Sequence, residues 1–450
     1  MIQEQRIQSL NDRGARSGSY VLYWMQQSQR AECNHALEYA IDRANHLGLP
    51  VVVFFGLTGS FPGANARHYA FMLEGLRQVG RDLNWRGILL VTRIVSPEKG
   101  AVEMARQAAL AVTDRGYLRI QKEWRAAAAE RIACGLVQVE SDVVVPVETA
   151  SPKEEYSAGT FRPKITRLLY GYLAPLKKRR CGRSSLGMNI RSDDIGDTAA
   201  VLRRLRVDDA VQPVGRPAGG TAAAKRLLSR FIERKLDSFG ELRNDPAEDN
   251  LSCMSPYLHF GQIAPLQIAL DVLKSGSPGK DRYLEELIVR RELAMNFVHY
   301  NPAYDQYACL PAWAKKTLAA HRRDRREYVY SRDQLERAAT HDRYWNAAQT
   351  EMVLTGKMHG YMRMYWGKKI LEWSRDPKEA FNTALYLNNR YSIDGRDPNG
   401  FAGVAWCFGK HDRAWPERAI FGKVRYMNDR GLERKFDMDA YCARVGSAFC

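Results

Sequence analysis

The first third of the chain alternates short apolar runs with segments whose apolar residues recur every three or four positions. The β-branched and aromatic run over residues 49–55 is typical of a strand that is buried in a parallel sheet. The predicted strands lie at 20–24, 49–55, 87–92, 110–113 and within 136–147, and the predicted helices at 30–46, 68–83, 102–109 and 123–135. This alternation predicts a doubly wound, Rossmann-like α/β domain with a parallel sheet over residues 1–147.

From residue 221 onward the apolar residues recur at helical spacing and strand signals are scarce. The predicted helices lie at 222–236, 265–274, 282–298, 333–339, 345–357, 361–374 and 378–388. We therefore expect an all-helical domain over 221–450. Residues 148–220 show weak periodicity and include proline and glycine clusters, so they are predicted to be an interdomain linker.

Charge, cysteine and histidine content indicate which partners and which kinds of site the chain can have. The 450 residues carry a net charge of +17, with a pI near 9.5, which favours a polyanionic partner such as a nucleic acid. The eight cysteines form no C-x-x-C pair, and the histidines show no metal-binding spacing, so no metal site is expected. The polar N-terminus and the lack of a long apolar run indicate a soluble intracellular protein without a membrane segment.

Three tryptophans suggest redox chemistry around a bound cofactor. Trp366 and Trp373 are seven residues apart, so in a helix they share a face about 10 Å apart along the axis. Trp345 lies in the preceding predicted helix. Indoles at such spacing can pass an electron from a buried cofactor to the surface, whereas the alternative is ordinary aromatic core packing.

Turn residues dominate the segment 394–400, where an acidic side chain could accept a hydrogen bond from a ligand's ring N–H. Arg363 is a plausible buried partner of Asp394, because an unpaired buried charge is costly. Ser252 and Ser255 precede a predicted helix that starts near Tyr257. They could bind phosphate at a helix N-terminus or simply cap the helix.

Two further groups of residues could bind nucleic acid. Glu286 and Arg290 are four apart on a predicted helix, so they could form an exposed ion pair, or Glu286 could hydrogen-bond a thymine edge. Trp406 precedes a basic segment that includes Lys410 and Arg413. Such a mixture suits an unstacked base beside a phosphate backbone.

Several ordered motifs along most of the chain resemble the photolyase/cryptochrome family, and among its members the class II cyclobutane pyrimidine dimer photolyases. The matching segments are 23–30 with 34–37, 243–246, 254–262, 290–293 with 296–297, 357–366 and 403–415. The resemblance implies an N-terminal antenna-type α/β domain and a C-terminal helical domain that holds FAD. It further implies a light-dependent DNA repair lyase whose reduced cofactor, FADH⁻, donates an electron to a flipped-out pyrimidine dimer.

The resemblance also implies residue roles. The implied FAD contacts are Ser252, Met254, Ser255, Arg291, Arg363, Asn388 near flavin N5, and Asp394. Trp366 would be the proximal electron donor, Trp345 the next and Trp373 an outer or accessory one. The implied contacts with the lesion or the DNA are Arg243, Asn244, Glu286, Arg290, Tyr361, Met364, Trp406, Lys410 and Arg413.

Two departures from the family pattern matter. Arg290 stands where many relatives carry tryptophan, so the two-tryptophan wedge around the dimer is incomplete. Arg396 stands where class I enzymes carry a second acidic residue, which favours class II. The sequence does not identify a second, antenna chromophore: it could be a deazaflavin or a folate, or there could be none.

Other functions remain alternatives. A cryptochrome-like blue-light receptor would bind flavin with little repair activity, and a basic nucleic-acid-binding scaffold would bind no flavin. The lack of a low-complexity extension after Trp415 counts against the receptor. The expected protein is a monomer that binds UV-damaged DNA, in the cytoplasm with the nucleoid or in the nucleus of a eukaryote.

Overall fold

The computed structural model describes residues 2–447, which form two compact units that are discontinuous in sequence. Unit 1 comprises 1–152, 164–229 and 253–276, and unit 2 comprises 153–163, 230–252 and 277–450. Most of the predicted linker over 148–220 therefore packs as part of unit 1. The segment 253–276, which was predicted to belong to the helical domain, also packs in unit 1. The boundaries at 147 and 220 stay a prediction about the functional domains.

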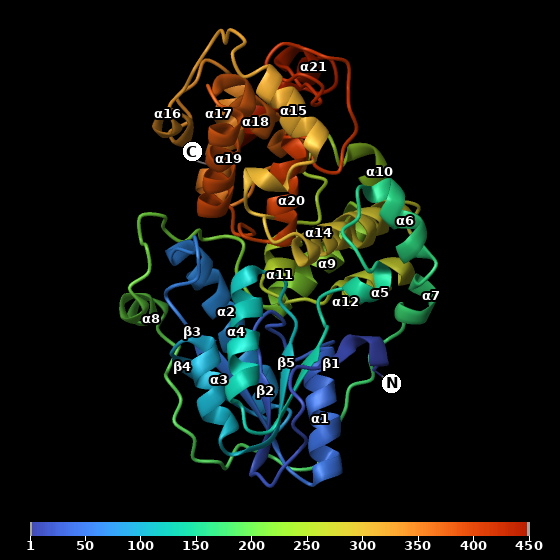
Figure 1. Cartoon of the computed structure of the whole chain (residues 1–450), viewed down its shortest axis with the longest axis vertical. Helices are drawn as coiled ribbons and strands as arrows, with labels where there is room; N and C mark the ends of the chain where they lie inside the picture. The colour runs from blue at the N-terminus through green and yellow to red at the C-terminus, as the bar shows by residue number, and fades with distance from the viewer. Residues whose placement is uncertain (1, 448–450) are drawn as a thin grey trace. The chain divides into compact units, whose positions relative to one another are not determined.

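The core of unit 1 is a six-stranded sheet in the order β1-β6-β5-β2-β3-β4 (Figure 1). Its strands are β1 (Ile7–Ser9), β2 (Tyr20–Trp24), β3 (Val51–Leu57), β4 (Leu89–Ile94), β5 (Ala108–Asp114) and β6 (Gly135–Val139). All neighbours pair in parallel except β1, which runs antiparallel to β6 with Ile7 opposite Val139. The predicted doubly wound parallel sheet is confirmed, and β1 is an edge strand that the apolar pattern did not indicate.

Alternate residues of each strand enter separate hydrophobic cores on the two faces of the sheet. Val21 and Tyr23 of β2 pack in one cluster with residues of α1 (His35–Leu47) and α2 (Ala66–Asn84). Leu22 and Trp24 pack in the other cluster with residues of α3 (Pro97–Ala105) and α4 (Arg119–Arg131). This arrangement follows from the period-two alternation of strand side chains, and it explains why β2 and β3 are apolar throughout.

The further helices of unit 1 are short. They are α5 (Val147–Ala150), α7 (Leu169–Tyr172), α8 (Thr198–Leu205), α11 (Ser255–His259) and α12 (Pro265–Lys274), while α6 (Ala158–Thr166) and α9 (Thr221–Arg234) cross a boundary between the units. The helix predicted over 265–274 has the observed ends, because Pro265 stands in its first turn. The helix predicted over 123–135 was wrong at its end, since β6 begins at Gly135.

Up to residue 447, unit 2 consists of helices joined by loops and turns, as predicted for this half of the chain. Its elements are α10 (Phe239–Leu242), α13 (Lys280–Leu284), the π-helical turn η2 (Glu285–Arg290), α14 (Arg291–Tyr300), the 3₁₀ turn η3 (Tyr307–Cys309), α15 (Ala312–Ala320), α16 (Arg332–Glu336), α17 (Arg343–Thr355), α18 (Gly360–Trp373), α19 (Pro377–Tyr391), α20 (Pro398–Cys407), α21 (Asp429–Glu433) and α22 (Met438–Ser447). Helix α18 packs against α17, α19 and α20, and this packing brings the predicted chemistry of unit 2 together.

Candidate functional site

The three predicted electron-transfer tryptophans lie in one continuous aromatic contact. Trp345 stacks on Trp366 with ring centroids 6.3 Å apart and planes 7° from parallel. Trp373 meets Trp345 edge-on at 5.6 Å, and each of the three indoles is at most 2% exposed. Trp345, from the neighbouring helix, therefore lies between the two indoles that the helical spacing placed on one face of α18.

Hydrogen bonds hold the two stacked rings. The Trp345 Nε1–H donates to the Trp366 carbonyl at 3.0 Å, and the Trp366 Nε1–H donates to Oε1 of the fully buried Gln349 at 2.9 Å. Tyr330 packs edge-on against Trp373 at 5.3 Å. Sequence reasoning missed Gln349, whose one signal was an amide among apolar residues of α17.

The turn between α19 and α20 carries the predicted acidic group. Asp394 is buried, and its Oδ1 lies 3.5 Å from Nη2 of Arg363 on α18, so the structure brings the predicted pair together. Asn389 stabilises the turn through two hydrogen bonds. Its Oδ1 accepts one from the Arg396 backbone N–H at 2.9 Å and one from Asn388 Nδ2 at 3.2 Å. Arg396 takes a left-handed backbone with φ of 68°. A β-branched residue at this position would be strained.

In this region, two buried side-chain oxygens find no hydrogen-bond partner among the residues that the structure describes. They are Oδ1 of Asn388, a residue that is 1% exposed, and Oδ1 of Asp394, which has only the longer ion-pair contact with Arg363. Leaving a buried acceptor unsatisfied costs about 1–3 kcal/mol, so both atoms suit hydrogen-bond donors of a bound group. A ring system with N–H groups is such a partner.

The other predicted cofactor residues divide between the units. Met254 and Ser255 begin α11 in unit 1, where Met254 is buried and Ser255 is half-buried. Ser252 ends a segment of unit 2, and Arg291, at the start of α14, is buried in unit 2. Their roles remain predictions.

Glu286 pairs with Arg243 at 2.5 Å, which joins two residues that were predicted separately to contact the lesion and the DNA. The alternative of an exposed pair between Glu286 and Arg290 was wrong. Arg290 instead meets Glu285, with Nε and Oε1 3.3 Å apart. The reason is the π turn η2, in which residues five apart are aligned, and such turns occur frequently at functional sites.

Two cations lie against the half-buried Trp406. Nζ of Lys368 is 5.0 Å from the ring centroid, and Cζ of Arg425 is 5.6 Å from it. Lys368 is fully buried and donates to the Cys407 carbonyl at 2.6 Å. Sequence reasoning missed Lys368 and Arg425, although a lysine on the buried stretch of α18 was a usable signal for the first.

The remaining predicted DNA contacts differ in exposure. Asn244 and Arg413 are exposed, and Arg413 lies over the ring of Trp415. Tyr361 and Met364 are half-buried on α18. Lys410 corrects the prediction, because it is 8% exposed and its ammonium is held by Glu154 and by the Cys309 carbonyl at 3.1 Å. A lysine so occupied is poorly placed to contact a phosphate.

The buried Lys368 gives a pH-dependent stability that can be measured. Burial lowers the pKa of Lys368 to about 8, against an ordinary value of 10.5. Between these values the unfolded chain binds the proton and the folded chain does not, so this group makes the free energy of unfolding rise with pH. Over the whole range from pH 8 to pH 10.5, this group raises the free energy of unfolding by about 3 kcal/mol.

Urea unfolding of the wild type and of Lys368→Met, each at pH 7.5 and 9.5, tests this pH dependence. The free energy of unfolding should rise more between the two pH values in the wild type than in the variant. An equal pH dependence of both proteins would contradict it.

Comparison with known proteins places these features in a family. The sequence model of the DNA photolyase family, described as "DNA photolyase", matches residues 21–180. A deoxyribodipyrimidine photo-lyase of Methanothermobacter thermautotrophicus is 58% identical over 447 residues, which is 99% of both chains. Proteins of the same name from Oryza sativa and Potorous tridactylus are 41% and 40% identical, over 98% and 95% of this chain and 90% and 81% of theirs.

Solved structures show the same fold. A class III photolyase from Agrobacterium tumefaciens superposes with a TM-score of 0.71 at 18% identity, over 96% of this chain and 87% of that one. An archaeal photolyase from Sulfolobus tokodaii, described with two FAD molecules, gives 0.70 at 15% identity, over 94% and 89%. In the described part of the chain, no helix has the length and apolar character of a membrane span.

A doubly wound α/β unit and a helical unit make up the fold of the photolyases among the solved structures. With a nearly full-length relative at 58% identity, the chain belongs to the DNA photolyase family. The predictions of family, fold class, lyase activity and light-dependent repair are confirmed.

Proposed function

We propose that this chain is a class II cyclobutane pyrimidine dimer photolyase that works with reduced FAD. The observation that carries the activity is the 58% identity to a deoxyribodipyrimidine photo-lyase over 99% of both chains. The class II assignment rests on the motifs at 254–262 and 357–366 and on Arg396. The reaction splits a cyclobutane ring without hydrolysis and without net redox change.

The polar groups around the turn at 394–397 fit a flavin ring. Asn388 and Asp394 each offer a buried oxygen that has no hydrogen-bond partner within residues 2–447, and reduced flavin has ring N–H groups that can donate to such oxygens. Nη2 of Arg363 lies 3.5 Å from Oδ1 of Asp394, and a carboxylate beside a guanidinium can also accept a hydrogen bond from a ring N–H. When bound, the flavin supplies the light-excited electron that starts cleavage. The residues of this turn hold the ring and exclude water around it.

The tryptophan stack fits the replenishment of that electron. Trp366, Trp345 and Trp373 are in successive ring contact, so an electron can pass along them by short steps. Their burial keeps water from the rings, and the hydrogen bond to Gln349 holds the Trp366 indole in place. We assign them to photoreduction of the cofactor rather than to splitting of the dimer.

The lesion side of the proposal rests on Glu286, Arg243 and Trp406. A base that leaves the duplex needs a hydrogen-bonding acid for its edge and an aromatic face for stacking, and the extrusion costs a few kcal/mol. Glu286 is half-buried beside Arg243, so entry of a base edge would exchange part of this ion pair for hydrogen bonds to the base. Trp406, flanked by two cations, offers the aromatic face.

A second chromophore, a deazaflavin or a folate, would fit unit 1 at the carboxyl ends of β2 and β5. These strands lie where the strand order reverses, which is the usual ligand crevice of such sheets. Two buried residues there have polar atoms without a hydrogen-bond partner in the described part of the chain, namely Oε1 of Gln26 and both Nε and Nη1 of Arg125. We further propose that the protein acts on UV-damaged DNA as a monomer, in the cytoplasm or the nucleus.

The test is light-dependent repair by the purified protein. The flavin is reduced chemically, the protein is mixed with thymine-dimer DNA, and the ultraviolet absorbance of the bases is followed under blue or near-UV light. We expect absorbance to recover only with both light and bound flavin. A flavin-replete protein that restores no bases would favour the cryptochrome-like receptor, and a protein without flavin would refute the cofactor assignment.

A further inference from the structure

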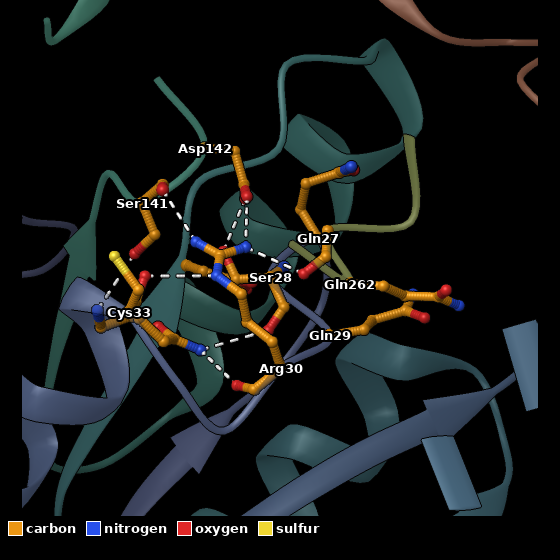
Figure 2. Close-up of polar contacts among 12 residues, drawn as sticks. Gln27, Ser28, Gln29, Arg30, Cys33, Ser141, Asp142 and Gln262 are labelled. Atoms are coloured by element: carbon orange, nitrogen blue, oxygen red, sulfur yellow. Dashed lines mark hydrogen bonds and ion pairs between the residues drawn. The ribbon is translucent and has the colours of Figure 1, made fainter. Parts of the chain in front are cut away.

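A buried guanidinium in unit 1 joins three segments that are distant in sequence (Figure 2). Arg30 is 1% exposed, and its Nη1 lies 2.7 Å from Asp142 Oδ1 and donates to the Gly261 carbonyl at 2.9 Å. Its Nη2 donates to the Ser141 carbonyl at 2.9 Å, and its Nε to the Cys33 carbonyl at 3.2 Å. We call these residues the Arg30 cluster.

The cluster and the neighbouring Gln27 contact the segment 259–262, whose first residue, His259, is the last residue of α11. Gly261 has a φ of +62°, and a Cβ there would lie 1.9 Å from the Gln27 carbonyl oxygen, so the two backbones are in close approach. The Gln27 side chain also donates to the His259 carbonyl. Three separate contacts of the loop after β2 therefore fix the position of the chain where α11 ends.

The buried carboxylates near position 30 explain why this residue is an arginine. Asp142 is buried and also accepts from the Ser28 hydroxyl. Asp114 is buried nearby, and burial together with the charge of Asp142 raises the pKa of Asp114 to about 6. A cation is needed beside such carboxylates, and only the fork of a guanidinium can serve a carboxylate and several carbonyls at once.

We propose that Arg30 is a positioning residue for the flavin-binding segment 254–261. The inference rests on the proposed function, in which Met254 and Ser255 at the start of α11 contact FAD. Helix α11 has five residues, so a displacement at Gly261 is carried to Met254 over less than two helical turns. Arg30 acts through the backbone carbonyl of Gly261 and need not touch the cofactor.

The test compares flavin affinity among variants of the whole chain. Arg30→Met removes every contact of the guanidinium, Arg30→Lys keeps a charge for Asp142 but cannot reach all the carbonyls, and Gly261→Ala disturbs the same segment without changing charge. The matched control is Arg86→Met. Arg86 pairs with Glu38 at 2.8 Å, its side chain is 6% exposed, and it also donates to two backbone carbonyls in unit 1, those of Ala31 and Arg179, but to none in the segment 254–261.

Flavin Kd is measured by fluorescence titration, next to the melting temperature of each flavin-free protein. We expect Kd to rise at least about tenfold in Arg30→Met and in Gly261→Ala, and less in Arg30→Lys. Arg86→Met should lower the melting temperature with Kd within about twofold of the wild type.

Unchanged Kd in the folded Arg30→Lys and Gly261→Ala variants would overturn the inference, as would an equal rise of Kd in Arg86→Met. A wild-type protein that binds no flavin would instead overturn the proposed function itself.

Discussion

Replacing Trp366 by phenylalanine is expected to slow photoreduction of the bound flavin at least about tenfold, which corresponds to about 1.4 kcal/mol in activation free energy. The reason is the geometry of the stack. Trp366 lies parallel to Trp345 at 6.3 Å and is hydrogen-bonded to Gln349, so its loss removes one indole from the series of ring contacts. Phenylalanine keeps an aromatic ring in the core but is much harder to oxidise. The measurement is flavin absorbance under blue light with an external reductant.

The same variant separates two processes that share the cofactor. Repair by chemically reduced Trp366→Phe should remain close to that of the wild type, because splitting of the dimer returns its electron and does not use the stack. Trp24→Phe is the matched control, since Trp24 is an equally buried tryptophan in the sheet of unit 1. Normal photoreduction in Trp366→Phe, or an equal loss in Trp24→Phe, would contradict the proposed role.

Replacing Asp394 by alanine is expected to weaken flavin binding by at least about 2 kcal/mol, or roughly thirtyfold in Kd. The substitution removes a buried acceptor for the ring and leaves the Arg363 guanidinium without its carboxylate. Flavin content after purification and the Kd of the flavin-free protein for added FAD measure the effect. Asp394→Asn should lie between the alanine variant and the wild type, because the amide keeps one acceptor but loses the charge.

The control for Asp394 is Glu351→Gln. Glu351 pairs with Arg444 at 3.4 Å, is likewise largely buried in unit 2, and has no predicted contact with the cofactor. It should retain flavin even if its melting temperature falls. Loss of flavin from Glu351→Gln to the same extent would show that Asp394 acts through general stability, and the assignment to the ring edge would be withdrawn.

The fold could be predicted where a local pattern and the tertiary environment agree. Strands β2 and β3 are buried on both faces, so their apolar character shows in sequence as well as in the sheet. Helix α12 has proline in its first turn and a regular apolar spacing. In contrast, residues 101–111 are rich in alanine, which suits a helix or a buried strand. The position of the neighbouring strands decided that α3 ends at Ala105 and that β5 begins at Ala108.

The candidate site was predictable where chemistry is carried by rare side chains. Trp345, Trp366 and Asp394 stood out by residue type and spacing, and the structure brings Trp345 against Trp366 and Asp394 against Arg363. Lys410 was misjudged from a basic stretch, because its partner Glu154 lies 256 positions away in sequence. A charge run shows that lysine is present but does not show which carboxylate neutralises it.

The amino-acid sequence by itself determined the alternating and helical halves, the basic charge and the motifs that mark the photolyase family. Those properties are local or additive, so they can be summed along the chain. Only the tertiary structure decided that Trp345 lies between the other two indoles, that a π turn pairs Arg290 with Glu285, and that Arg30 holds the Gly261 carbonyl. The Trp345 and Arg30 contacts depend on how distant segments pack, and a backbone carbonyl that accepts a hydrogen bond leaves no trace in the sequence. The Arg290 pair is local, but the 3.6-residue helical period predicts a different partner.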